Sequence, residues 1–217
     1  MKKVLIFDLD GTLIDTLKDL HKAVNFALSI FHYPERSLEQ VRKDIGNGVA
    51  KLMERSIPNG LLNENYANSL EKFKEYYRSH YNVFTTAYDG MKETLSQLVK
   101  EGYLITVATN KIKDVAKELL DEHYSGLFTY IQGDAEGIKK KPDSDMIERI
   151  VSHYGVSKEE VLYIGDTNVD EETALNAGVD YVLVTYGYRT IEEIKRMCKC
   201  TNLLDKPSDL ISYLSLL

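Results

Sequence analysis

The sequence predicts an α/β protein, in which a parallel sheet carries helices on both faces and an all-helical domain is inserted after the first strand. Two observations predict this fold. From residue 88 onward, short β-rich runs alternate with helical patterns, which is typical of a parallel sheet. Between residues 16 and 85, helical periodicity recurs without a strong strand pattern. The chain has 217 residues, which is enough for a core plus a small inserted domain.

The first strand is predicted at residues 4–7, a short apolar run that leads into Asp8, Asp10 and the turn signal Gly11. Alternation along an extended chain places the two carboxylates on the same side, at the strand end where open parallel sheets bind ligands. Two carboxylates so close repel each other, and a hard divalent cation such as Mg²⁺ is the natural compensation. Taken alone, this Asp-x-Asp pattern is equally typical of a turn or a helix cap.

Four helices are predicted in the following block. The first ends before Pro34, and the second begins at the capping-box pattern of residues 37–40. Because the two ends of an inserted domain lie close together, we expect this block to act as a lid at the carboxyl edge of the sheet. The apolar residues at helical spacing are Leu17, Leu20, Val24, Ala27, Leu28 and Phe31, then Leu38, Val41 and Ile45, then Leu52 and Met53, then Leu70, Phe73 and Tyr77.

The rest of the chain alternates helices with strands. Residues 1–15 together with 86–217 are therefore predicted to form a Rossmann-like core, and residues 16–85 the helical cap domain. The helical patterns cover 91–99, 115–120, 146–151 and 171–177, and the β-rich runs cover 103–108, 130–131, 161–164 and 181–184.

Composition limits the partners and the compartment. The net charge of −7 makes a nucleic-acid backbone an unfavourable partner, and no apolar run reaches the length of a membrane span. The N-terminus leads directly into a strand without a signal-peptide pattern, so we expect a cytoplasmic protein. Cys198 and Cys200 are a poor metal site by themselves, and we expect them to be ordinary residues late in a helix.

Three further polar groups stand out in the core part of the chain, two of them at predicted strand ends. Thr109 and Asn110 follow the strand at 103–108, where a hydroxyl and backbone amides suit a phosphate oxygen, although both residue types are also good helix caps. The lysines at 139–141 form the strongest local positive charge, which by itself is typical of a solvated turn. The strand at 161–164 leads into Asp166.

Four stretches, in the order in which they occur along the chain, resemble the signature motifs of the haloacid dehalogenase superfamily of phosphatases. They are Asp8-Leu9-Asp10-Gly11-Thr12-Leu13 followed by Asp15-Thr16, then Thr109, then Lys141 directly before Pro142, and finally residues 161–170. The resemblance implies that Asp8 is the nucleophile, which requires an acid and a phosphate site around it. It also implies Mg²⁺ as the cofactor.

The same resemblance implies a role for each of the other residues. Asp10 would be the general acid/base, and Thr12 would orient it by a hydrogen bond. The Asp8 carboxylate, the Asp10 backbone carbonyl and Asp166 would bind the metal, with Asp170 supporting it through a water or the lysine. Thr109 and Lys141 would bind the transferred phosphoryl group, and Asn110 would contribute its amide.

The position of the cap and its Gly46-Asn47-Gly48 turn resemble phosphoglycolate phosphatases, and so does the stretch 186–189. A Gly-Asn-Gly turn entering a helix could bind a small carboxylate or phosphate with its backbone amides. Arg42 and Lys51 flank this turn and could add charge, although solvated basic residues beside a helix C-cap explain them slightly better.

The expected function is therefore hydrolysis of a small phosphomonoester with Mg²⁺ through an aspartyl-phosphate, with a phosphoglycolate-like substrate favoured. A pyrophosphatase or nucleotidase would use the same core, and a phosphomutase would return the phosphoryl group to a sugar. A non-catalytic metabolite-binding module is the alternative from another class. The expected partner is a small phosphorylated substrate, and the chain is expected to be a monomer or a homodimer.

Overall fold

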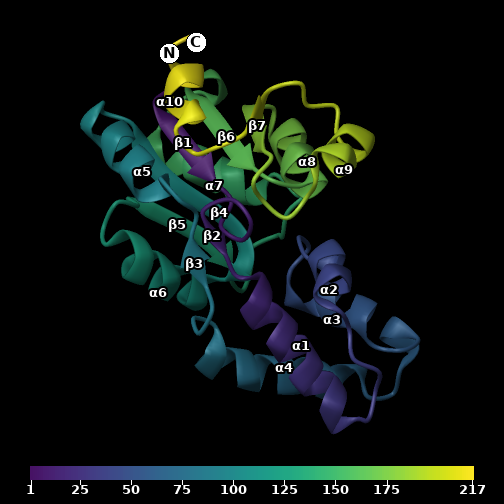
Figure 1. Cartoon of the computed structure of the whole chain (residues 1–217). Coiled ribbons are helices and arrows are strands. Elements are labelled where there is room, and N and C mark those ends of the chain that lie inside the picture. The colour runs from purple at the N-terminus through teal and green to yellow at the C-terminus, as the bar shows by residue number, and fades with distance from the viewer. The chain divides into compact units, whose positions relative to one another are not determined.

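The computed structural model describes all 217 residues and divides the chain into two compact units (Figure 1). The core unit comprises Met1–Ile14 and Ala87–Leu217, and the helical unit comprises Asp15–Thr86. Strands β2 (Ile14–Asp15) and β3 (Thr86–Ala87) pair as a two-stranded ribbon where the chain passes from one unit to the other. The N-terminal and C-terminal parts of the core unit thus flank a single insertion.

The core unit is built on a six-stranded sheet with the order β5-β4-β1-β6-β7-β8, and the pairings between its strands are parallel. Its strands are β1 (Val4–Phe7), β4 (Leu104–Ile112), β5 (Tyr130–Asp134), β6 (Val161–Gly165), β7 (Asp180–Val184) and β8 (Leu203–Leu204). Phe7 at the end of β1 pairs with Val107 on one side and Ile164 on the other. Residues that follow these three positions therefore meet at one edge of the sheet.

Helices cover both faces of this sheet, which confirms the predicted fold class (Figure 1). The chain moves from β1 through β4 to β5 in one direction and then returns to β6 and β7 in the other. Because parallel crossovers are right-handed, the helices of the two halves lie on opposite faces. The helices are α5 (Met91–Lys100), α6 (Lys113–Tyr124), α7 (Asp145–Tyr154), the 3₁₀ turn η2 (Lys158–Glu160), α8 (Asn168–Ala177), α9 (Ile191–Met197) and α10 (Asp209–Leu214).

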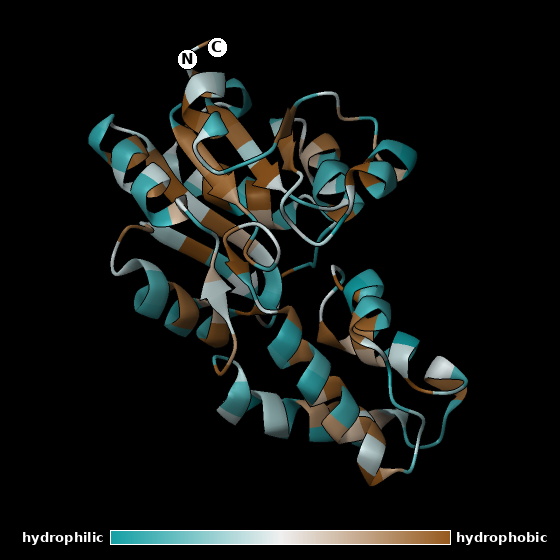
Figure 2. Cartoon of the chain, in the orientation of Figure 1, coloured by the Kyte–Doolittle hydropathy of each residue, from teal (hydrophilic) through white to brown (hydrophobic).

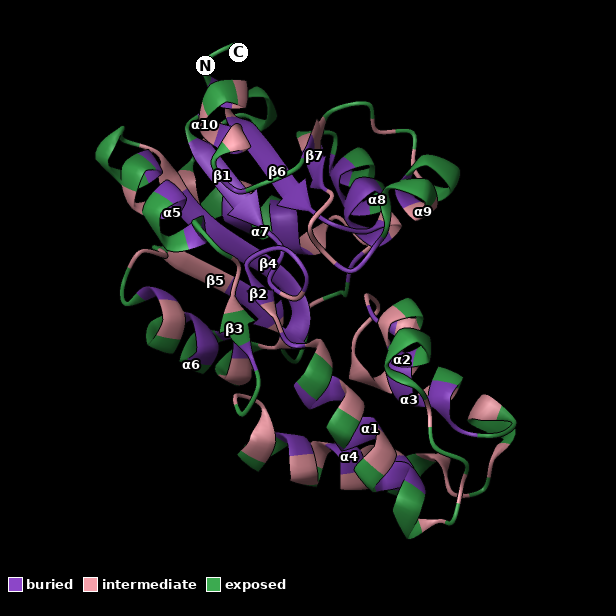
Figure 3. Cartoon of the chain, viewed as in Figure 1, coloured by how far each residue is buried: buried purple, intermediate pink, exposed green.

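Strands β1 and β6 are almost entirely apolar and buried, as the brown ribbons of Figure 2 and the purple ribbons of Figure 3 show. On one face, α7 and α8 pack against β1 and β6 through a single cluster. Its side chains include Val4, Ile6, Ile147, Ile150, Tyr163 and Ala174. Strands buried on both faces read as continuous hydrophobic runs, which is why β1 and β6 could be predicted from their sequences.

The helical unit contains four helices and a short 3₁₀ turn: α1 (Leu17–Ile30), α2 (Leu38–Asp44), α3 (Val49–Ser56), η1 (Gly60–Leu62) and α4 (Tyr66–His80). The capping box predicted at the start of α2 is confirmed. Ser37 Oγ accepts from the backbone N–H of Gln40 at 3.2 Å, and the Ser37 N–H donates to Gln40 Oε1 at 2.8 Å. No helix in the chain is long and apolar enough to cross a membrane.

One buried carboxylate ties the end of the helical unit to its beginning. Asp19 on α1 accepts hydrogen bonds from the backbone N–H groups of Val83, Phe84 and Thr85 and from the Thr85 hydroxyl, at 2.8–3.1 Å. The side chain is almost fully buried. These bonds satisfy backbone groups that would otherwise lack partners after α4 ends.

Three local predictions differ from the structure. Strand β4 continues to Ile112, beyond the predicted end at 108, because its pairing with β5 shifts register between Ala108 and Ile112. Strand β8 and helices α9 and α10 had no prediction, because they are too short for a clear period. Cys198 and Cys200 lie after α9, which ends at Met197, rather than within a helix.

Candidate active site

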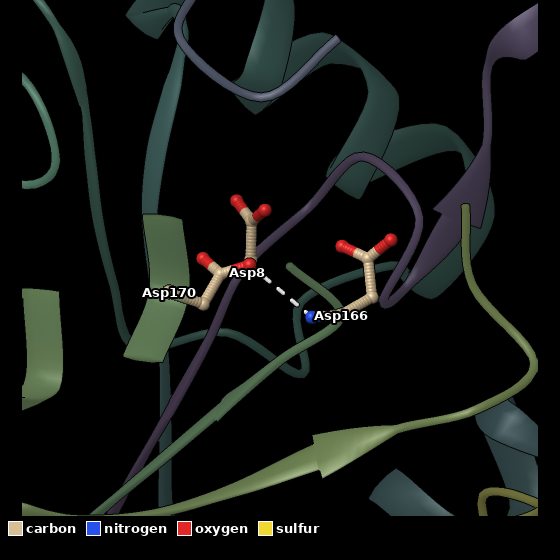
Figure 4. A group of neighbouring side chains, drawn as sticks. All are labelled: Asp8, Asp166 and Asp170. Atoms are coloured by element: carbon tan, nitrogen blue, oxygen red, sulfur yellow. Dashed lines mark hydrogen bonds between the residues drawn. The ribbon is translucent and has the colours of Figure 1, made fainter. Parts of the chain in front are cut away.

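Three carboxylates meet at the carboxyl edge of the core sheet (Figure 4). Asp8 directly follows β1, Asp166 directly follows β6, and Asp170 lies on the first turn of α8. Each offers an oxygen within 4.8 Å of the others, and all three residues are buried. Figure 4 shows the carboxylates of Asp8 and Asp166 projecting to the same side of their chain segments.

A buried lysine links two of these carboxylates. Lys141 Nζ lies 2.8 Å from Asp8 Oδ1 and 2.8 Å from Asp170 Oδ1, and it donates to the Tyr163 hydroxyl at 2.9 Å. Burial alone would lower the pKa of Lys141, but the nearby carboxylates of Asp170 and Asp8 outweigh it and hold that pKa well above its usual value. The ammonium therefore stays charged at neutral pH.

The three consecutive lysines, of which the family resemblance selects Lys141, have separate partners in the structure. Lys139 pairs with Asp143 at 3.4 Å and Lys140 pairs with Asp134 at 2.6 Å, and both lysine side chains are substantially exposed. The Lys141 side chain is only 1% exposed. Of the three, it is Lys141 that lies among the site carboxylates.

Asp170 is bound on every side. Its two oxygens accept five hydrogen bonds, from Lys141, the Tyr163 hydroxyl, the Asp166 N–H, the Thr167 N–H and the Thr167 hydroxyl, at 2.7–3.2 Å. Burial alone would raise the pKa of Asp170, but Lys141 and these hydrogen bonds lower it below its usual value. Asp170 is thus a fixed anion that holds the lysine and the turn after β6.

The pKa values of Asp8 and Asp166 are shifted in the opposite direction from that of Asp170. Burial, which outweighs the opposing effect of Lys141, raises the pKa of Asp8 to about 7. Burial, followed by the charges of Asp170 and Asp8, also raises the pKa of Asp166 well above its usual value. These two carboxylates are therefore difficult to ionise together, and their oxygens are of the ligand type that a hard divalent cation prefers.

The loop after β7 reaches back to Asp166. The Tyr188 N–H donates to Asp166 Oδ2 at 2.7 Å. Gly187 permits this approach, because a Cβ atom there would collide with the Gly11 carbonyl oxygen and the Asp166 side chain. The resemblance of the stretch 186–189 to phosphoglycolate phosphatases gave it no role, and its contact with Asp166 had no signal in the sequence.

Asp10 has a cationic partner that sequence reasoning missed. Lys111 Nζ lies 2.8 Å from Asp10 Oδ1 and 3.1 Å from Oδ2. The Lys111 side chain is only 3% exposed and that of Asp10 is 17% exposed. A lysine three residues beyond a predicted strand end gave no indication that it folds back on β1, since their separation in the chain is about one hundred residues.

Thr109 and Asn110 lie within β4, not at a helix start, and the N-cap of α6 is Ile112. The alternative that they cap a helix is therefore wrong, because the strand extends past them. Thr109 Oγ1 accepts from the Lys111 N–H at 3.2 Å. The Asn110 amide group bonds the backbone of Lys141 in both directions, accepting at 2.8 Å and donating at 3.0 Å.

Thr12 is placed differently from the expectation. Its hydroxyl donates to Asp166 Oδ1 at 3.5 Å, whereas we expected it to orient Asp10. Thr12 lies in a tight turn, closed by the Thr12 N–H to the Leu9 carbonyl oxygen and the Gly11 N–H to the Ile14 carbonyl oxygen, so its placement does not follow extended alternation from Asp10.

In the helical unit, Gly48 is the N-cap of α3, with Gly46 and Asn47 in the turn before it. Arg55 braces this turn by donating to Asn47 Oδ1 at 2.9 Å and to the Asp44 carbonyl oxygen at 2.7 Å, a contact that the sequence analysis missed. The two flanking cations bond glutamates on their own helices, Arg42 with Glu39 at 2.7 Å and Lys51 with Glu54 at 2.6 Å.

Comparison with known proteins places this site in a family. Residues 5–184 match the family model described as haloacid dehalogenase-like hydrolase. Phosphoglycolate phosphatase of Aquifex aeolicus is 32% identical over 214 residues, which cover 98% of this chain and 96% of that protein. Phosphoglycolate phosphatase of Pseudomonas savastanoi pv. phaseolicola is 36% identical over 194 residues, which cover 87% of this chain and 71% of that protein.

Solved structures agree with this assignment. The crystal structure of a predicted phosphoglycolate phosphatase from Haemophilus somnus 129PT superposes with a TM-score of 0.90 at 28% identity, covering 98% of both chains. A crystal structure from Lactobacillus delbrueckii subsp. bulgaricus superposes with a TM-score of 0.92 at 28% identity, covering 99% of both chains. The chain belongs to the haloacid dehalogenase-like hydrolase family and is a phosphatase.

Proposed function

We propose that this phosphatase hydrolyses a small phosphomonoester with Mg²⁺, through an aspartyl-phosphate formed on Asp8. The observation that carries this proposal is the environment of Asp8. Its carboxylate is buried beside Asp166 and bonded to Lys141, so a nucleophile, a cation site and a fixed positive charge converge on one point.

The residues present fit a hard divalent cation. Asp8 and Asp166 supply carboxylate oxygens, the ligand type that Mg²⁺ prefers. Asp166 accepts hydrogen bonds from the Tyr188 N–H and the Thr12 hydroxyl, and the charge of Arg189 lowers its pKa by less than burial raises it. When bound, the ion would offset the repulsion between the Asp8 carboxylate and a phosphate dianion. We assign its ligands as Asp8, Asp166 and the Asp10 backbone carbonyl.

In the first step, an Asp8 oxygen attacks phosphorus in line with the ester oxygen. The bond between phosphorus and the ester oxygen breaks, its electron pair moves to that oxygen, and Asp10 delivers a proton to it. The products are an alcohol and the phosphorylated Asp8. Lys141, held by Asp170, stabilises the charge that gathers on the phosphoryl oxygens.

In the second step, water attacks the phosphorus of the aspartyl-phosphate. Asp10, now a carboxylate, takes a proton from that water, and the bond between phosphorus and Asp8 breaks. Inorganic phosphate leaves and both aspartates return to their starting states. The same residue thus gives and receives one proton in each cycle.

Thr109 completes the phosphate site. Its oxygen accepts from the Lys111 N–H, which leaves the hydroxyl proton to donate to a phosphoryl oxygen. Asn110 fixes the backbone at Lys141 and so determines where the ammonium lies. We therefore assign Thr109 to phosphate binding and Asn110 to positioning the lysine.

We propose residues 16–85 as a cap that selects the substrate, with the Gly46-Asn47-Gly48 turn as its anion-binding element. Arg55 holds this turn in one conformation, which is what a recognition loop needs. Because curated relatives over most of the chain are phosphoglycolate phosphatases, a phosphoglycolate-like substrate is favoured.

The test is phosphate release from a panel of 2-phosphoglycolate, pyrophosphate, nucleoside monophosphates and sugar phosphates, with Mg²⁺ and with a chelator. Asp8→Asn should abolish release, and the exposed Asp114→Asn should leave it unchanged. Acid-quenched enzyme should carry phosphate on the peptide that contains Asp8. Release that persists in Asp8→Asn would overturn the proposed mechanism.

A further inference from the structure

The two buried lysines of the site serve different carboxylates. Lys141 bonds Asp8 and Asp170, on the side of the proposed nucleophile. Lys111 bonds Asp10, on the side where the proposed acid meets the leaving group. The second cation has no task in the phosphoryl-transfer steps described above, although its side chain is only 3% exposed.

We propose that Lys111 is a substrate-binding residue that recognises negative charge on the leaving group, next to the ester oxygen. This inference rests on the proposed function, because it uses Asp10 as the group that protonates that oxygen. The chemical class is a phosphate compound whose leaving group carries a second anion close to the bridging oxygen. This anion is a carboxylate or phosphate one carbon away, or a phosphate bonded directly to that oxygen.

The geometry supports this assignment. Lys111 Nζ lies 2.8 Å and 3.1 Å from the two Asp10 oxygens, so any oxygen that approaches Asp10 also approaches the ammonium. In 2-phosphoglycolate a single methylene carbon separates the ester oxygen from the carboxylate. A substrate with its ester oxygen at Asp10 therefore brings that carboxylate within reach of Lys111, whose buried ammonium can form a strong charge-assisted hydrogen bond.

The position of the lysine is firmly set. Lys111 lies near the end of β4, and its backbone N–H is bonded to Thr109 Oγ1 at 3.2 Å. Gly133 on β5 lets the chain after Asn110 pack closely, since a Cβ there would meet the Lys113 Cα at 2.6 Å and the Lys111 carbonyl oxygen at 3.0 Å. The Lys111 ammonium is thus held by the core sheet beside Asp10. It is therefore placed to contact the leaving group rather than the phosphoryl group.

The experiment compares 2-phosphoglycolate with ethyl phosphate, which has a leaving group of similar size without the charge. Lys111→Met should lower kcat/KM for 2-phosphoglycolate by about 10- to 100-fold more than for ethyl phosphate. Lys111→Arg, which keeps the charge, should restore part of the preference. Lys113→Met removes an exposed lysine two residues along the chain and should leave the ratio unchanged.

The ratio of the two kcat/KM values does not depend on the fraction of folded enzyme, so partial misfolding of Lys111→Met does not affect it. Pyrophosphate, assayed in parallel, reports whether a second phosphate serves as well as a carboxylate. An equal fall for charged and uncharged leaving groups would overturn the inference, leaving Lys111 as a residue that only positions Asp10. A wild-type enzyme that releases phosphate from no compound would instead overturn the proposed function itself.

Discussion

Lys141 Nζ and Asp170 Oδ1 lie 2.8 Å apart, and both side chains are essentially inaccessible to solvent. The same ammonium reaches Asp8, so the first turn of α8 determines how the cation stands against the end of β1. Asp170 therefore acts on the site through the lysine, and its own oxygens are already occupied by hydrogen-bond donors.

Asp170→Asn should destabilise the fold by about 3 kcal/mol, because it leaves a buried ammonium with one anionic partner fewer. The substitution also replaces one carboxylate oxygen, which accepts hydrogen bonds, with an NH₂ group that would face the hydrogen-bond donors around residue 170. The measurement is the free energy of unfolding in urea. The exposed Glu172→Gln on the same helix is the control, and it should change stability by less than about 0.5 kcal/mol. Equal stabilities of the two variants would contradict the structural role given to Asp170.

Mg²⁺ affinity should fall as the pH decreases below about 7. Burial raises the pKa of Asp8 to about 7, so below that pH the metal must displace a proton from its ligand. The expected loss is about tenfold in affinity for each pH unit below this pKa. Calorimetric titration in buffers of different ionisation enthalpy measures both the affinity and the protons released.

The same raised pKa of Asp8 has a consequence for the metal-free protein. Between pH about 4 and about 7 the folded chain holds a proton that the unfolded chain has lost. The contribution of Asp8 to stability is therefore greatest at the acidic end and declines as the pH rises through this window. In Asp8→Asn, the Mg²⁺ affinity and the free energy of unfolding should both depend less on pH. If either pH dependence stayed unchanged, Asp8 would be excluded as its source.

Gly187→Ala should weaken Mg²⁺ binding at least about tenfold and destabilise the fold by about 1–3 kcal/mol. The added Cβ would collide with Asp166 and the Gly11 carbonyl oxygen, so the loop must move away from the carboxylate that Tyr188 holds. Gly126→Ala is the matched control, because Gly126 has a positive φ but open space around it. It should cost stability through backbone strain and leave metal affinity unchanged.

Asp19→Asn should increase amide hydrogen exchange at residues 83–85 and destabilise the chain by about 2 kcal/mol. The asparagine amide presents N–H donors to backbone N–H groups that need an acceptor. Exchange measured by mass spectrometry locates the effect, and the exposed Glu71→Gln on α4 serves as the control. Unchanged protection at 83–85 would show that other contacts hold this segment.

Local signals explain which elements could be predicted. Strands β1 and β6 are short apolar runs that end in carboxylates, and the capping boxes at Ser37 and Ser157 involve residues only three apart. Each of these patterns is contained within a few neighbouring residues. The short elements near the C-terminus had no such pattern, because a strand such as Leu203–Leu204 forms only beside the existing edge of β7.

By itself the sequence determined the fold class, because strand and helix periods are local patterns, and its four motifs selected the aspartates and Lys141 as candidate site residues through their resemblance to a known family. Only the tertiary structure decided their partners. The Asp10–Lys111 pair, the Tyr188 contact with Asp166 and the contact of Lys141 with Asp8 join segments far apart in the chain. Such contacts depend on sheet order and register, which set distances that no local pattern encodes.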